Sequence, residues 1–138
     1  MKQSLRLMII TILALLLFAC GSKYDRVEST LSDYADAMED YVARMEKAES
    51  ADDVVNAMKG YTQKIKTLIP RLQEMHKQFP ELASGKKFPG ELEKVSRRMK
   101  TMGDKVQAAM MKTMQYMMDP KVQKAMTEQA QAMAQTGQ

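Results

Sequence analysis

The chain has 138 residues, a length that suits one domain and leaves little room for a second. It carries 21 basic and 17 acidic side chains, and its single cysteine excludes an internal disulfide. Hydrophobic residues make up 45% of the sequence, including 15 methionines, so a buried core must be stabilised by packing alone.

The first twenty residues differ in character from the rest of the chain. Lys2 and Arg6 accompany an apolar run that extends from Leu7 to Phe18. This run is shorter than the about 20 apolar residues that a membrane-spanning helix needs. A basic start, a short apolar run and a small residue before the cleavage point are typical of a secretory signal peptide.

Leu17-Phe18-Ala19-Cys20 resembles the lipobox of bacterial lipoprotein precursors, although Phe18 is bulkier than the residue usual at its position. The resemblance implies that residues 1–19 are removed as a signal peptide and that the Cys20 thiol is joined to diacylglycerol. The new amino group would be acylated, typically with palmitate. Two or three acyl chains anchor a protein stably, so the expected partner is a lipid bilayer. Gly21 in place of Asp implies the outer membrane, with the protein facing the periplasm.

Cleavage would also change the charge balance. Without Lys2 and Arg6, 19 basic residues face 17 acidic ones, and the net charge falls from +4 to +2. A balance so close to neutral gives no reason to expect nucleic-acid binding. We expect residues 20–23 to form the lipidated tether and residues 24–135 to form one helical domain.

Apolar residues recur at helical spacing, and no segment alternates as a strand would. The predicted helices span residues 24–48, 51–79, 91–118 and 120–134. Residues 80–90 are rich in proline and glycine and should turn the chain. The sequence therefore predicts an all-α fold, an antiparallel three-helix bundle with a shorter fourth helix at the C-terminus.

Local signals support these boundaries. Ser50 and Asp53 resemble a capping box with Asp in the usual Glu position. Pro70 should bend the second helix without ending it, because its ring removes one backbone hydrogen bond. Asp119 followed by Pro120 is typical of a helix start.

Four carboxylates should lie opposite the apolar face of the first helix. They are Asp33, Asp36, Glu39 and Asp40. A metal site is the alternative, but the group contains no histidine. We expect this face to be solvated.

Five methionines lie between residues 110 and 118, in a chain that keeps 13 methionines after cleavage. Met110, Met114 and Met117 have the spacing of one helical face, so their thioethers form a candidate site for Cu(I) or Ag(I). Met111 and Met118 lie at the edge of that face and form a candidate interaction patch. Packing in the core or against the last helix is the third alternative, because methionine fills irregular gaps.

His76 is the single histidine and shares the apolar face of the second helix. Imidazole is a haem ligand, so a haem or small-ligand carrier is a further alternative to a structural role. Residues 45–58 resemble the first helix connection of the cytochrome b562 family, which ligates haem through a methionine in helix one and a histidine near the C-terminus. Ala35 occupies the expected methionine position, and the last helix lacks histidine. The resemblance implies the bundle and not the haem.

Residues 77–82 and 119–125 are similar to segments of small Gram-negative lipoproteins of unknown function. The chain lacks the usual motifs of metal, nucleotide and triad catalysis. We therefore expect no enzymatic activity and no resident cofactor. The predicted function is a non-enzymatic binding or structural module of the cell envelope with an unidentified envelope protein as partner.

Overall fold

The computed structural model describes residues 21–83 and 88–135, and within these ranges all regular secondary structure is helical. The predicted all-α class is thereby confirmed. The elements are α2 (Asp25–Lys47), α3 (Ala51–Gln78), α4 (Pro80–Ala83), the 3-10 turn η1 (Gly90–Leu92), α5 (Glu93–Gln115) and α6 (Pro120–Ala134). The proposed signal peptide and Cys20 lie outside the described residues.

Both predicted helix starts are confirmed. The Ser50 hydroxyl accepts a hydrogen bond from the Asp53 N–H at 3.2 Å, and the Asp53 carboxylate accepts one from the Ser50 N–H at 3.1 Å. This reciprocal pair is the capping box of α3. At the start of α6, Asp119 Oδ1 accepts from the Lys121 N–H at 2.8 Å, and Pro120 takes the first helical position.

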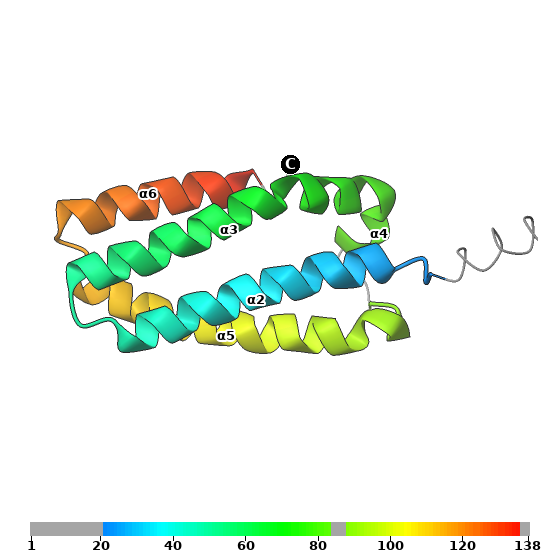
Figure 1. Ribbon diagram of the computed structural model, residues 1–138, viewed down its shortest axis with the longest axis horizontal. Coiled ribbons are helices and arrows are strands. Elements are labelled where there is room, and N and C mark those ends of the chain that lie inside the picture. The colour runs from blue at the N-terminus through cyan, green and yellow to red at the C-terminus, as the bar shows by residue number, and fades with distance from the viewer. Residues whose placement is uncertain (1–20, 84–87, 136–138) are drawn as a thin grey trace, which may run out of the picture.

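The second long helix continues through Pro70, as predicted. Pro70 is exposed, so water can bind the carbonyl that loses its helical partner. Figure 1 shows the C-terminal part of α3 turning away from the direction of its first part. The short helix α4 follows almost at once, within the segment that we predicted as a turn.

The third long helix ends earlier than its predicted end at Met118. α5 stops at Gln115, and residues 116–118 form a turn with hydrogen bonds between residues three apart, such as Met117 N–H to the Met114 carbonyl at 3.3 Å. The cause lies downstream, because a residue before proline is driven out of the helical region. Asp119 accordingly has extended backbone angles, and the helix must end before it.

The four long helices lie in the order α6, α3, α2, α5 (Figure 1). Long helices that follow one another along the chain run in opposite directions, so the neighbours α3 and α6 run in the same direction. α2 packs between α3 and α5, whereas α6 packs on α3. The main core joins all four helices through buried side chains such as Tyr41, Met58 and Val122. A smaller core, which includes Val27 and Leu92, closes the end where residue 21 enters the bundle.

The acidic face of α2 is exposed to solvent, as predicted, and it also forms ion pairs that the sequence did not predict. Its carboxylates remain partly exposed but bind cations of α2 itself and of both neighbouring helices. The pairs are Asp33 with Arg71, Asp40 with Lys64 and Arg44, and Asp36 and Glu39 with Arg98. Exposed pairs of this kind contribute at most about 1 kcal/mol each. Their main effect is therefore to fix the register of α2 against α3 and α5, and they add little to the stability of the bundle.

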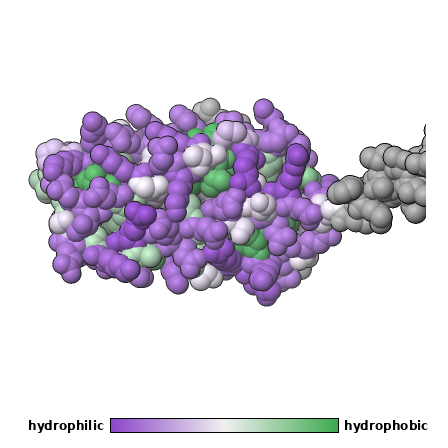
Figure 2. Space-filling model, viewed as in Figure 1, coloured by the Kyte–Doolittle hydropathy of each residue, from purple (hydrophilic) through white to green (hydrophobic). Residues whose placement is uncertain are grey.

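The surface in this view is largely hydrophilic, with small and separate hydrophobic areas (Figure 2). None of the helices in the described ranges is long and apolar enough to cross a membrane.

Candidate hydrophobic binding site

Exposed apolar side chains gather at one place on the molecule. The large hydrophobic residues exposed in the described ranges are all methionines, and they are Met110, Met111, Met114, Met117, Met118 and Met126. They belong to the C-terminal half of α5, the turn after it, and α6. Their exposed fractions run from 38% for Met126 to 86% for Met118. A patch this concentrated is typical of an interaction site.

The exposure follows from the way α5 and α6 pack. In the first half of α5 the apolar stripe is buried, as at Val95 and Met102. Beyond Val106 the same stripe becomes exposed, because α6 packs on α3 and leaves this side of α5 uncovered. Core or helix packing, our third alternative for the methionine cluster, is therefore wrong for these exposed side chains.

A cavity of about 520 Å³ lies between α5 and α6, and its floor is made by α2 and α3. We call it the Met groove. Its fifteen lining residues are Tyr34, Met38, Tyr41, Met58, Tyr61, Val106, Gln107, Met110, Met111, Thr113, Met114, Met126, Gln129, Ala130 and Met133. Seven of these are methionines, and each of the four long helices contributes at least one. The groove therefore depends on the whole bundle.

Three tyrosines form the floor of the Met groove. The rings of Tyr41 and Tyr61 lie 5.0 Å apart between centroids, and the Tyr61 hydroxyl donates to the Tyr34 hydroxyl at 3.4 Å. Burial raises the pKa of Tyr61 well above its ordinary value, and the neighbouring Tyr34 adds to this effect. Burial likewise raises the pKa of Tyr41, whereas the nearby Thr113 hydroxyl acts in the opposite direction. Both buried phenols are neutral at physiological pH.

Thr113 places a buried hydroxyl in this wall without a hydrogen-bond partner. Its side chain is 4% exposed, and Oγ1 has no partner among the described residues. Tyr41 is close enough for the Thr113 hydroxyl to affect its pKa, but the two groups do not meet the geometry of a hydrogen bond. An unsatisfied buried hydroxyl costs about 1–3 kcal/mol, so it calls for an explanation.

Charge is absent from the lining of the Met groove. Apart from the tyrosines, none of its lining residues has an ionisable side chain, and Gln107 and Gln129 supply the only amides. The lysines of the same part of α5 lie elsewhere, since Lys105 and Lys112 line a small depression against α2. The groove is suited to an uncharged, apolar occupant.

The structure brings together only part of the candidate metal set. Met110 and Met114 line the Met groove, whereas Met117 follows the end of α5 and does not line it. The Met groove therefore includes two of the three predicted ligands, and the convergence of all three sulfurs stays a prediction. Of the interaction candidates, Met111 lines the groove, and Met118 stands beyond it in the turn.

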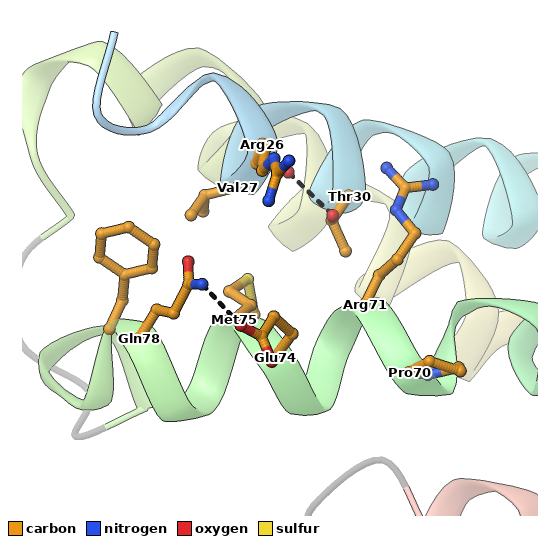
Figure 3. A pocket seen from close by; sticks show the side chains of 9 residues that line it. Arg26, Val27, Thr30, Pro70, Arg71, Glu74, Met75 and Gln78 are labelled. Carbon is orange, nitrogen blue, oxygen red and sulfur yellow. Dashed lines mark hydrogen bonds between the residues drawn. The ribbon is translucent and has the colours of Figure 1, made fainter.

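His76 is partly buried near the end of α3. A second cavity, of about 410 Å³, lies between α2 and the C-terminal part of α3, and its lining does not include His76. Figure 3 shows Arg26 and Arg71 above this cavity and Met75 within it, while Glu74 accepts a hydrogen bond from Gln78 at 2.6 Å. Arg71 is already paired with Asp33. In the described residues, no three His, Cys, Asp or Glu side chains come together as a metal site.

Sequence reasoning missed the floor of the Met groove and its α6 wall. The tyrosines and Met126 lie on apolar helical faces, so periodicity assigned them to the core, and no local signal distinguishes a groove from a core position. Thr113 carried no signal either, because a lone threonine in a helix is ordinary.

No protein-family model, no curated protein and no solved structure matches this chain.

Proposed function

We propose that this protein is a membrane-anchored lipoprotein of the cell envelope and a non-enzymatic binding module whose binding site is the Met groove. The observation that carries the binding role is a cavity of about 520 Å³ lined by all four long helices. The anchor rests on the lipobox-like sequence ending at Cys20, and Gly21 supports an outer-membrane location facing the periplasm.

The dimensions and composition of the Met groove support a binding role. Ligand pockets typically have about 300–1,000 Å³ and a mainly apolar lining with a few polar groups. Methionine side chains are flexible and polarisable, so a wall of them adapts to the shape of its occupant. A groove left uncovered by the chain itself exposes this surface at a cost in free energy, which an occupant would offset.

The position of the Met groove suits a tethered protein. The start of α2 lies at one end of the bundle, and the turn between α5 and α6 lies at the other (Figure 1). α2 has 23 residues and spans about 35 Å between these ends. A protein anchored at Cys20 would hold the exposed methionines away from its own attachment point.

The anchor is tested by the mass of the protein purified from envelopes. We expect a chain that begins at Cys20 and carries diacylglycerol and an amide-linked acyl chain. A Cys20→Ser variant should keep its full-length mass. An unmodified, full-length wild-type chain would contradict the anchor and leave the Met groove unaffected.

The binding role is tested by native mass spectrometry of the protein purified gently from envelopes. Ala130 lines the Met groove on its α6 side, whereas the neighbouring Gln131 is exposed and does not line it. An added indole should fill the groove in Ala130→Trp and leave it open in Gln131→Trp. We expect the wild-type protein and the Gln131→Trp variant to carry a bound molecule. The Ala130→Trp variant should lack it. Identical bound material on all three would remove the groove as the binding site.

Soft-metal binding is a second candidate because seven methionines line one cavity. Thioether sulfur prefers Cu(I) and Ag(I), so titration with Cu(I) under reducing conditions should then show saturable binding. Replacing Met110 and Met114 together by leucine should abolish it, and Met118→Leu should leave it unchanged. An absence of saturable binding would remove this candidate.

A further inference from the structure

We infer that the occupant of the Met groove is the acyl chain of a lipid, held with its carbonyl oxygen at the buried hydroxyls of Thr113 in the α5 wall and Tyr41 in the floor. This inference rests on the proposed role of the groove as a binding site and names the class of ligand. An acyl chain is long, flexible and uncharged, and it ends in a carbonyl group that accepts hydrogen bonds.

The walls of the Met groove match the hydrocarbon part of such a ligand. Met110, Met114 and Met126 are exposed and face a space that no part of the described chain fills. Burying a methylene group contributes favourably with each carbon, so a long chain gains affinity from apolar walls without any charged contact. Unbranched methionine side chains can follow an unbranched chain closely.

The buried hydroxyls of the Met groove match the polar end of the ligand. Thr113 Oγ1 is buried without a partner, and a carbonyl oxygen is the acceptor that its hydroxyl lacks. The Tyr41 hydroxyl lies nearby and is kept neutral by burial, so it too is a donor rather than a negative charge. A bound carbonyl would satisfy the one hydroxyl of the wall for which residues 21–83 and 88–135 provide no partner.

The lining also predicts that a negative charge on the ligand gains no favourable contact in the groove. It contains no Lys or Arg, so an anionic headgroup finds no charged partner in it. Burying a carboxylate without a cationic partner costs free energy, so the uncharged methyl ester should compete for the site at least tenfold more strongly than the fatty acid at neutral pH, where tenfold corresponds to about 1.4 kcal/mol. The second cavity provides the contrast, because the cationic side chains of Arg26 and Arg71 are part of its lining (Figure 3).

The test uses the full chain in envelopes and a photoactivatable, alkyne-tagged palmitic acid. After irradiation, labelled peptides are mapped by mass spectrometry. We expect label on the groove segments of α5 and α6, loss of label in Ala130→Trp, and full label in the control Gln131→Trp. Competition by unlabelled palmitic acid and by a palmitoyl lysophospholipid then distinguishes a free fatty acid from a membrane lipid as the source of the acyl chain.

A second variant tests the role of Thr113 separately from the fold. Thr113→Val should weaken competition by palmitic acid and by its methyl ester and leave competition by hexadecane unchanged, because hexadecane has no carbonyl. Equal effects on all three competitors would contradict the assigned role of the hydroxyl.

Three results would overturn the inference. One is label that persists in Ala130→Trp, and another is label at the cavity beside Arg26 and Arg71. The third is capture of a protein segment in the Met groove with no lipid label, which would leave the proposed binding role in place with a different occupant. If nothing at all is bound in the groove, both the inference and the proposed function fail.

Discussion

Thr113 and the tyrosines beside it show how single residues separate the binding site from the core. A threonine within an apolar helical face is unremarkable in sequence, and its significance appears only when its hydroxyl is found buried and unpaired. The same holds for Tyr34. Its position on the apolar stripe of α2 correctly predicts that its side chain faces the other helices. Periodicity cannot tell that the space in front of it is open.

Replacing Thr113 by valine should stabilise the empty protein. The substitution keeps the β-branched shape and removes an unsatisfied buried hydroxyl, whose burial costs about 1–3 kcal/mol. We expect the free energy of unfolding in urea to rise by roughly 1 kcal/mol. A loss of 1 kcal/mol or more would show that the hydroxyl has a stabilising partner.

Tyr41 and Tyr61 should make the fold sensitive to alkali. Burial raises the pKa of both phenols above the ordinary value of 10.0, so the folded state resists their ionisation. A group with a raised folded pKa contributes its full stability below the unfolded pKa and loses it as the pH rises. The contribution of these two tyrosines to stability should therefore be constant below about pH 10 and fall above it, as the ultraviolet absorbance of tyrosinate rises. Substituting phenylalanine for Tyr61 should reduce this loss, and an unchanged alkaline transition would contradict the assignment.

At the scale of the elements, the sequence predicted most where local chemistry decides. Ser50, Asp53 and Pro120 act within one turn, so the starts of α3 and α6 were predictable. The end of α5 was not, because apolar spacing continues to Met118 while the backbone requirement of Pro120 stops the helix at Gln115. That difference places Met117 in the turn after α5, where it does not line the Met groove.

The capping box of α3 allows a direct test of how much a local signal contributes to stability. Ser50→Ala removes the oxygen that accepts from the Asp53 N–H. N-cap substitutions of this kind cost about 1 kcal/mol. We expect the urea midpoint to fall by the concentration that corresponds to this loss of free energy, and the m-value to stay unchanged. Ser50→Asp is the control and should keep most of the stability, since Asp is also a good N-cap.

Gly103 offers a gain of similar size in α5. A Cβ added there meets nothing within 4 Å, and glycine inside a helix costs about 1 kcal/mol relative to alanine. Gly103→Ala should therefore raise the melting temperature. A lower melting temperature would mean that this face of α5 is not open in solution.

At the scale of the whole molecule, the sequence predicted an all-helical chain but could not predict where α6 packs. A single apolar face identifies which side of a helix is buried and not which neighbour buries it. Val122 and Ala125 bury α6 against α3, and the C-terminal half of α5 is left uncovered as a result. The Met groove is thus a property of the assembled bundle, and its residues appear in sequence as ordinary core positions.

The central claim is that the Met groove, rather than any other face of α5, contacts the binding partner. Gln107 lines the groove, and Lys105 lies two residues away against α2, and both side chains are exposed. A photo-crosslinking amino acid placed at either position in cells therefore samples two sides of one helix. We predict a crosslinked lipid or protein from position 107 and none from position 105. Equal crosslinking from both positions, or none from 107, would contradict the account.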